Sequence, residues 1–283
     1  MEFAAELHDI VFQDLRFLFP EISKQLRVIV YDVAPKVLSM FDAKLGEYAM
    51  DTLRRENIEI RTSRKIQALE SGLPGTVKED SSVAHMRGLT LKVKDEPDLG
   101  IGMCVWSTGL AQNPFVEKSL GGTHTLPTED ISGQTSNIPA GTKWTITQDQ
   151  KTGSIMTDHQ LRVMLEPKSE TKDGTSRTVL NNVFAIGDCA MMHDTNYPAT
   201  AQVASQKGYW LAKRLNKNDL ESSRFEFKNL GTMAYLGGAN AIMQSGSKSL
   251  GNISGRMAWV IWKGAYLTKT LSWRNRILLP IYW

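Results

Sequence analysis

Two neighbouring stretches, Val183-Phe-Ala-Ile-Gly-Asp188-Cys-Ala190 and Pro198-Ala-Thr-Ala-Gln202-Val-Ala-Ser-Gln206, decide the fold of this chain. The first is typical of a buried strand that ends in Gly187-Asp188, and the second opens a helix that is predicted to run to Leu215. Such a strand places a carboxylate at the carboxyl edge of a sheet, where open α/β folds bind their ligands, and the glycine lets the backbone come close to one. The pattern predicts that Asp188 accepts hydrogen bonds from ribityl or ribose hydroxyls. An aspartate that only caps the next turn is the alternative.

The predicted helix carries Gln202 and Gln206 on one face, because residues four positions apart are neighbours on a helix surface. Small side chains at Ala201, Ala204 and Ser205 leave this face thin enough for a planar ring to approach. A helix amino terminus that points at a flavin would stabilise the anionic reduced ring. The glutamine amides could donate hydrogen bonds to a quinone carbonyl. Two solvated glutamines on a surface helix are the alternative.

From its second residue the chain has the pattern of a helix already under way, and no capping residue precedes Glu2. A β-branched run from Leu26 to Asp32 predicts a strand that ends in a carboxylate, and Ala34-Pro35 then turns into a helix that ends near Leu53. Short strands are predicted next at Ile58–Ile60, Lys65–Leu69, Gly88–Val93 and Ile101–Trp106. This order is typical of the second half of a nucleotide-binding α/β layer.

The remaining segments have weaker patterns. Residues 118–153 and 168–178 are rich in Gly, Thr, Ser, Asp and Pro, and we predict surface loops there. A strand is predicted at 224–228, and the following segment, Gly231–Gly251, is rich in glycine. From about Gly255 the chain is predicted to be helical.

The net charge of +3 conceals an uneven distribution along the chain. All 30 acidic residues lie at or before Glu226, so residues 1–226 hold 30 acids against 26 bases and sum to −4. Residues 227–283 contain seven basic side chains and no acid. The basic excess therefore belongs to the last segment, which indicates an anionic partner for that segment alone.

Cysteine, histidine and hydropathy patterns exclude several classes of protein. Cys104 and Cys189 each sit beside an apolar run, which is typical of reduced thiols and not of a disulfide framework. The five histidines show no spacing for metal ligands, so no metal site is predicted. The first twenty residues are acidic, unlike a presequence. Apolar runs near the end are far shorter than the roughly twenty residues that span a bilayer.

The last segment combines cations with interfacial aromatic side chains. Trp259, Trp262 and Tyr266 fall on one helical stripe, and Arg274 and Arg276 follow in a second aromatic stretch. This composition describes a helix that lies in the headgroup layer of a membrane. Nucleic-acid binding shares the composition and is less favoured. A buried seam of a homodimer is the other alternative.

Four stretches resemble the type II (alternative, rotenone-insensitive) NADH:quinone oxidoreductases of fungi and plants. They occur in the family's order and are Val105-Trp-Ser-Thr-Gly109, Ala185-Ile-Gly-Asp188-Cys-Ala190, Pro198-Ala-Thr-Ala-Gln202-Val-Ala-Ser-Gln206 and Ala234-Tyr-Leu-Gly237. The resemblance covers most of the chain. It implies FAD and NADH as cofactors and a quinone as the electron acceptor.

The resemblance also assigns residues to the flavin and the quinone. Gly187 and Asp188 would bind FAD, with Ala201 at the start of the following helix. Thr108 and Gly109 would close the nucleotide strand near the flavin. Gln202 and Gln206 would line the site where quinone meets the flavin.

The start of the chain resembles the segment that follows the NADH-binding glycine loop of the family, Val-Glu-Phe-Ala-Ala-Glu-Leu. Glu2 would then face the nicotinamide. Asp32 would accept hydrogen bonds from the adenosine ribose and favour NADH over NADPH. We therefore expect an amino-terminal portion to be missing. By the same reasoning, residues 1–110 are expected to be the remainder of the NADH-binding domain, 111–225 the later part of the FAD-binding domain, and 226–283 a membrane-anchoring region.

The sequence thus predicts an α/β fold, namely an incomplete two-dinucleotide-binding-domain flavoprotein of Rossmann-like type with a C-terminal membrane-surface helical segment. The resemblance implies hydride transfer from NADH to FAD and then two-electron reduction of ubiquinone without proton pumping, at the surface of the mitochondrial inner membrane. A sulfide:quinone oxidoreductase is a second interpretation. Its chemistry needs a pair of cysteines beside the flavin, whereas Cys104 and Cys189 are predicted at strand edges, as is typical of the first family. A third interpretation is that the chain is a truncated, non-catalytic, membrane-associated protein.

Overall fold

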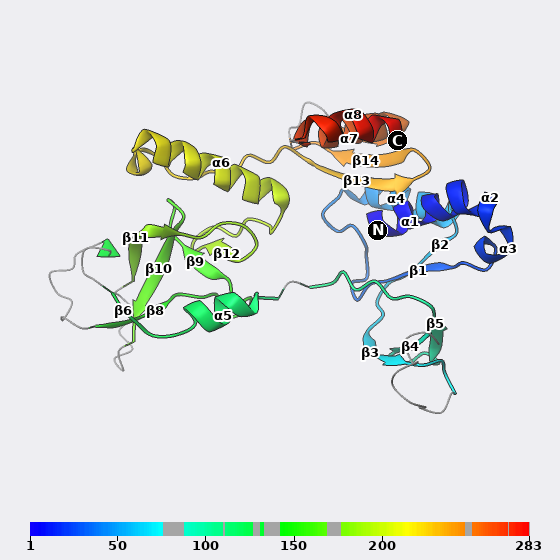
Figure 1. Cartoon of the computed structure of the whole chain (residues 1–283), viewed down its shortest axis with the longest axis horizontal. Coiled ribbons are helices and arrows are strands. Elements are labelled where there is room, and N and C mark those ends of the chain that lie inside the picture. The colour runs from blue at the N-terminus through cyan, green and yellow to red at the C-terminus, as the bar shows by residue number, and fades with distance from the viewer. Residues whose placement is uncertain are drawn as a thin grey trace. The chain divides into compact units, whose positions relative to one another are not determined.

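The computed structural model describes residues 1–75, 88–109, 111–126, 131–132, 142–168, 177–246, 251–270 and 272–282. The chain folds as two units, one made of Met1–Trp106 with Asn229–Trp283 and the other of Ser107–Lys228 (Figure 1). The last segment therefore packs with the first one, and each unit has its own hydrophobic core. Most of the expected loop at 168–178 lies outside the described residues.

The first unit begins with a helical segment and a parallel β–α–β element. In chain order its parts are α1 (Glu2–Asp9), the π-helical η1 (Ile10–Leu15), α2 (Arg16–Leu18), α3 (Pro20–Ser23), β1 (Val28–Tyr31), α4 (Ala43–Arg55) and β2 (Ile58–Arg61). β1 and β2 pair in parallel, with Val28 opposite Ile58. The predicted opening helix and both strands are confirmed.

The helix α4 begins later than the sequence predicted. We expected a helix to follow Ala34-Pro35, but residues 33–41 form bends and turns. The helix starts at Ala43 because the Asp42 carboxylate accepts a hydrogen bond from the Lys44 amide at 3.0 Å and so caps the first turn. The buried residues of α4 share one face and are Leu45, Ala49, Thr52 and Leu53.

A three-stranded antiparallel sheet completes the amino-terminal part of this unit. Its strands are β3 (Ile66–Ser71), β4 (Leu89–Val93) and β5 (Leu99–Ile101). The strand predicted at Ile101–Trp106 is wrong, since β5 ends at Ile101 and residues 103–109 have no regular structure. The strands predicted before it are confirmed to within one or two residues.

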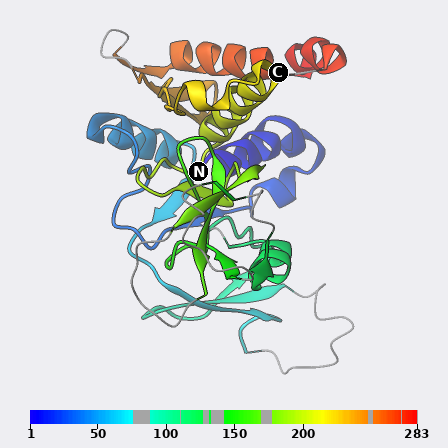
Figure 2. The same ribbon diagram turned by 90° about the vertical axis from the view of Figure 1, so that its left-hand side faces the viewer.

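The carboxyl-terminal segment adds a second antiparallel sheet and two helices. These are β13 (Thr232–Gly237), β14 (Asn240–Gln244), β15 (Asn252–Gly255), α7 (Arg256–Lys269) and α8 (Trp273–Tyr282). The sheet lies between α7 on one face and α1 with α4 on the other (Figures 1 and 2). Leu53, Ile58, Leu236 and Ile242 are fully buried in this sandwich, and each contributes roughly 1.5–3 kcal/mol to its stability.

The second unit is a mixed sheet with two covering helices. Its elements are α5 (Pro114–Leu120), β6 (His124–Thr125), β7 (Ile131–Ser132), β8 (Lys143–Ile146), β9 (Ile155–Thr157), β10 (Arg162–Pro167), β11 (Thr178–Phe184), β12 (Ala190–Met192), α6 (Ala201–Lys217) and the 3-10 turn η5 (Leu220–Ser222). The central strand β10 pairs with β8, β9 and β11, and β12 pairs in parallel with β9.

Three predictions for this unit need correction. The region 118–153 is not all loop, because β8 carries Trp144 into the core at 2% exposure. The strand before Gly187 is not buried throughout, since Val183 is 42% exposed; antiparallel sheets leave one face to solvent. No strand forms at 224–228. That segment is extended, but side chains and an isolated backbone contact hold it.

Candidate functional site

A cavity of about 640 Å³ lies in the second unit, beside Gly187 and Asp188. Its walls come from within four segments, 111–113, 151–154, 187–192 and 196–207. Gly187 has φ of +83°, which disfavours any side chain, and no atom stands within 4 Å of where its Cβ would be. The backbone is therefore open to a ligand at the place where the sequence predicted close approach.

The helix α6 turns two different faces to its surroundings. Thr200, Val203, Ala204 and Lys207 line the cavity. At about 100° per residue, Gln202 and Gln206 lie on the opposite side of the helix. The fold thus joins the predicted Gly187 and Asp188 to this cavity, whereas the cavity wall does not include the predicted Ala201, Gln202 and Gln206.

The amide of Gln206 has backbone partners. Its Nε2 donates to the Lys228 carbonyl at 2.8 Å, and its Oε1 accepts from the Lys228 N–H at 3.0 Å. The same extended segment is held by the Phe225 N–H, which donates to the His159 carbonyl at 3.0 Å, and by the Phe227 N–H, which donates to the Tyr197 hydroxyl at 3.4 Å. The sequence predicted a strand at residues 224–228, and a strand would pair with a neighbouring strand. At Lys228 the Gln206 amide supplies this backbone pairing instead.

Two polar groups of the cavity were not found by sequence reasoning. Lys207 is 2% exposed, and burial lowers the pKa of its ammonium group. Gln112 donates from Nε2 to the Gly153 carbonyl at 2.5 Å, which leaves its buried Oε1 without a partner among the described residues. The only available signal for Lys207 was its position seven residues after Thr200 on one helical face.

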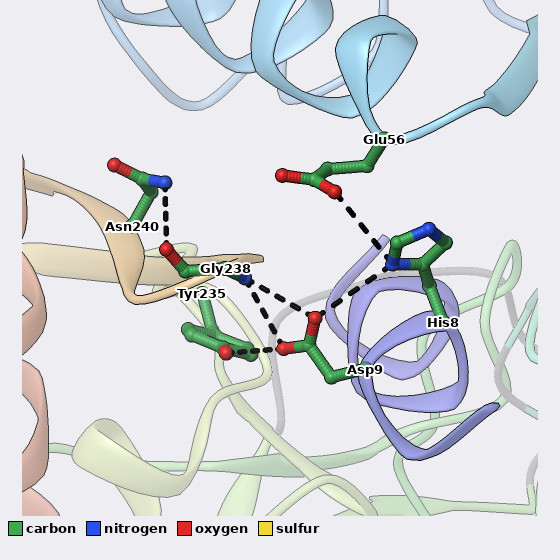
Figure 3. A network of polar contacts seen from close by, with 6 residues as sticks. All are labelled: His8, Asp9, Glu56, Tyr235, Gly238 and Asn240. Atoms are coloured by element: carbon green, nitrogen blue, oxygen red, sulfur yellow. Dashed lines mark hydrogen bonds and ion pairs between the residues drawn. The ribbon is translucent and has the colours of Figure 1, made fainter. Parts of the chain in front are cut away.

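In the first unit, carboxylates of α1 hold the β13–β14 hairpin (Figure 3). Glu2 Oε1 accepts from the Tyr235 N–H at 2.8 Å. The Tyr235 hydroxyl donates to Asp9 Oδ2 at 2.5 Å, and the Gly238 N–H donates to both Asp9 oxygens at 3.2 Å. Burial first, and then the bond to Asp9, raise the pKa of Tyr235 far above its usual 10.0. Glu2, predicted to face a nicotinamide, is therefore oriented by a backbone amide of the last segment.

His8 occupies the space between α1 and the end of α4. It is 7% exposed and stacks on Phe12 with ring centroids 4.4 Å apart. Its Nδ1 lies 3.7 Å from Asp9 Oδ1 and 3.9 Å from Glu56 Oε2, as the dashed lines in Figure 3 mark. These contacts attract only when His8 is protonated. The imidazole of α1 thus lies next to a carboxylate of its own helix and to one at the end of α4.

The aromatic residues of α7 divide between core and surface. Trp262 stacks on Tyr235 at 5.2 Å, and both Trp259 and Trp262 pack against the core. Tyr266 is 47% exposed, and Lys263 lies 3.9 Å from the centre of the Trp259 ring. Burial lowers the pKa of Lys263. The exposed apolar side chains of α7 and α8 are instead Met257, Val260, Trp273, Ile277 and Ile281.

The remaining predicted residues lie at the ends of other segments. Asp32 follows β1, and its Oδ1 accepts from the Ala34 N–H at 2.9 Å, so it caps its own turn. Thr108 and Gly109 are exposed and irregular, with Gly109 at φ +73°. Arg276 donates from Nε to the Thr270 carbonyl at 2.7 Å. Arg274 is exposed.

Arginines near Asp32 are held by another carboxylate. The Asp32 N–H donates to the Arg61 carbonyl, and the Arg64 N–H donates to the Asp32 carbonyl, each at 3.0 Å. Glu96 pairs with both guanidinium groups, with Arg61 at 3.1 Å and with Arg64 at 2.9 Å. Glu59 pairs with Arg61 alone, at 2.8 Å. Both cations beside Asp32 are therefore already neutralised.

Residues 229–283 match the family described as the NDH2 C-terminal domain. The whole chain is 30% identical to a probable NADH dehydrogenase of Dictyostelium discoideum, of which it covers 51%. It is 29% identical to the external NADH-ubiquinone oxidoreductase 2 of Saccharomyces cerevisiae mitochondria, of which it covers 48%. Over its full length the chain is thus similar to NADH-ubiquinone oxidoreductases, and its last segment matches the NDH2 C-terminal domain. It spans about half the length of the curated relatives that it matches.

A solved structure supports the same fold for this NDH2 relative. NDH2 from Plasmodium falciparum, in a structure with NADH, superposes with a TM-score of 0.66 at 17% identity, over 98% of this chain and 61% of that one. The predicted α/β fold of Rossmann-like type is confirmed. Within the described residues, no group of His, Cys, Asp or Glu side chains could hold a metal ion, and no helix is long and apolar enough to cross a bilayer.

Proposed function

We propose that this chain supplies the NADH-binding and quinone-reducing part of a flavin-dependent NADH:quinone oxidoreductase that does not pump protons. The observation that carries the proposal is the similarity over the full chain to proteins named NADH dehydrogenase or NADH-ubiquinone oxidoreductase. Bound FAD would supply the hydride acceptor and pass two electrons to a quinone. The residues below would bind and orient the three partners.

For FAD, the cavity of the second unit offers complementary groups. Gly187 leaves its backbone open, and the exposed Asp188 carboxylate can accept hydrogen bonds from ribityl or ribose hydroxyls. The amino terminus of α6 and the buried Lys207 supply positive potential to a phosphate or an electron-rich ring. These donors and acceptors fit a phosphorylated, hydroxyl-bearing cofactor. Thr108, Gly109 and Ala201 are assigned to the same cofactor by resemblance.

For NADH, the first unit offers two carboxylates. Asp32 uses Oδ1 on its own turn, so Oδ2 can accept hydrogen bonds from a ribose hydroxyl. Glu2 has one oxygen fixed by the Tyr235 amide, which orients the other toward a nicotinamide. Within the described residues, Glu96 pairs with both Arg61 and Arg64, so these two cations are engaged by a carboxylate and are not aimed at a 2′-phosphate. This arrangement favours NADH over NADPH.

For the quinone, we assign Gln202 and Gln206 on α6. The contacts with Lys228 fix which end of the Gln206 amide donates and which accepts. One N–H of that amide is left for a quinone carbonyl, because an amide nitrogen has two donors. The support for this assignment is the family resemblance and the fixed amide.

For the membrane, we propose that α7 and α8 lie on a lipid surface, and on the mitochondrial inner membrane in the cell. Trp273, Ile277 and Ile281 are spaced four residues apart and are each more than 60% exposed. Arg274 and Arg276 flank them. We therefore assign insertion to this stripe and to Tyr266, while Trp259 and Trp262 support it from the core side.

The test is a stepwise flavin assay on the purified chain. FAD fluorescence should be quenched on binding, NADH should bleach flavin absorbance, and decylubiquinone should restore it. Asp188→Ala should weaken FAD binding, whereas Glu221→Ala, at an exposed carboxylate of the same unit outside the cavity wall, should not. A chain that binds no flavin, or flavin that NADH cannot bleach, would contradict the proposal.

A further inference from the structure

Lys207 carries a positive charge into the interior of the second unit. The side chain is 2% exposed and forms part of the cavity wall. Lysine is almost never buried this deeply without a partner, because removal of an ammonium group from water is costly. In the part of the chain that the structure describes, its ammonium makes no hydrogen bond or ion pair. Because Lys207 forms part of the cavity wall, an anionic group of a ligand in the cavity would compensate the charge.

The other titratable groups of the cavity do not compensate it. The Cys189 thiol donates a hydrogen bond to the Ile186 carbonyl at 3.5 Å. Asp188 lines the cavity but is exposed. Lys151 at the rim adds a second cation. The Tyr197 hydroxyl accepts a hydrogen bond from the Phe227 amide at 3.4 Å.

One further feature of the cavity has the polarity that an anionic ligand requires. Thr200 caps α6 by accepting from the Val203 N–H at 3.4 Å, so the positive end of a 17-residue helix dipole lies at the cavity. Lys207 stands nearly two turns further along the same face.

We propose that Lys207 is the counter-charge for an anionic oxygen of a phosphorylated ligand, and that the cavity consequently prefers phosphorylated to neutral forms of the same ring. The inference rests on the proposed flavin site and adds to it a residue that sets ligand charge. Charge-assisted hydrogen bonds in a dry site contribute more than those at a surface. We expect a preference of about tenfold, which corresponds to ~1.4 kcal/mol.

The test compares riboflavin, FMN and inorganic pyrophosphate as ligands of the 283-residue chain, with flavins followed by fluorescence and pyrophosphate by calorimetry. FMN should bind about tenfold tighter than riboflavin. Lys207→Met should abolish that difference. Lys207→Arg should retain part of it. Lys213→Met is the matched control, because Lys213 is exposed on the same helix.

Each outcome decides between the two proposals. An FMN advantage that survives in Lys207→Met, or equal binding of FMN and riboflavin by the unaltered chain, overturns the role of Lys207 but leaves the flavin site standing. Binding of pyrophosphate that depends on Lys207, without binding of any flavin, supports the role of Lys207 and contradicts the flavin site. Failure of all three ligands to bind overturns both. Lys151→Met tests the second lysine of the cavity wall. This variant should retain the preference for FMN, because only removal of the buried charge of Lys207 should abolish it.

Discussion

The Gln206 side chain pairs with both backbone polar groups of Lys228, donating at 2.8 Å and accepting at 3.0 Å. An amide that meets a peptide group in this way reproduces one rung of a β-ladder. It anchors to α6 the last residues of the second unit, just before the chain enters the first unit at Asn229. A residue that resemblance assigns to the quinone thus also has a structural role.

Gln206→Leu should lower the free energy of unfolding by about 1 kcal/mol or somewhat more, because two backbone groups lose a partner. Gln206→Glu should destabilise similarly, since a carboxylate cannot donate to the Lys228 carbonyl. Urea denaturation measures the change, and Lys213→Leu on the exposed face of α6 is the control. If Gln206→Leu were as stable as the unaltered chain, the two hydrogen bonds between Gln206 and Lys228 would not contribute to stability. If Gln206→Leu also loses quinone reduction, that loss must be compared with its loss of stability, so that a folding defect is not taken for a defect in the quinone site.

Tyr235→Phe should destabilise the first unit by roughly 1.5–3 kcal/mol, because a buried hydroxyl leaves the Asp9 carboxylate. The pKa of Tyr235 is raised above 10.0 in the folded chain, so the unfolded chain loses this proton first as pH rises. Stability from Tyr235 is therefore complete below pH 10 and declines above it. The pH dependence of unfolding above pH 10 should be smaller in Tyr235→Phe. Burial also raises the pKa of Tyr31 and of Tyr266. Both proteins should therefore retain the part of the pH dependence of stability that comes from these two tyrosines.

Lys207→Met should stabilise the ligand-free chain by about 1–3 kcal/mol, since an unpaired buried ammonium is replaced by an apolar side chain of similar length. Burial lowers the pKa of Lys207 below 10.5, so the unfolded chain binds this proton more tightly. The stability of the unaltered chain should therefore rise with pH through the folded pKa toward 10.5, and Lys207→Met should lack that rise. Thermal melts across this pH range measure it. A less stable Lys207→Met chain would show that the ammonium has an internal partner.

Glu96→Gln should weaken the selection against a 2′-phosphate, because Arg61 and Arg64 both lose a carboxylate partner beside Asp32. The affinity for 2′,5′-ADP relative to ADP should increase roughly threefold, as expected for a partly exposed guanidinium. Glu59→Gln is the matched control, since Glu59 pairs with Arg61 alone and leaves Arg64 held by Glu96. Calorimetric titration gives both affinities. Equal ratios in Glu96→Gln and Glu59→Gln would exclude the restraint by Glu96.

Local pattern determined much of this protein. Apolar spacing found α1, α6 and α7, and the β-branched run ending at Asp32 found β1, because an element that buries one face must repeat its apolar residues at its own period. The Gly187-Asp188 pair was likewise readable from sequence, since a strand end and a glycine with positive φ are local properties.

The tertiary structure decided the partners, which local pattern cannot specify. Sequence spacing put Gln202 and Gln206 on one face, but only the fold turned the opposite face, with Lys207, toward the cavity. The stripe of Trp259 and Trp262 had the composition of a membrane-facing surface, yet both pack against a core that includes residues more than 200 positions earlier, such as Ala5. Burial depends on which surfaces meet across such distances, and those contacts form only when the chain has folded.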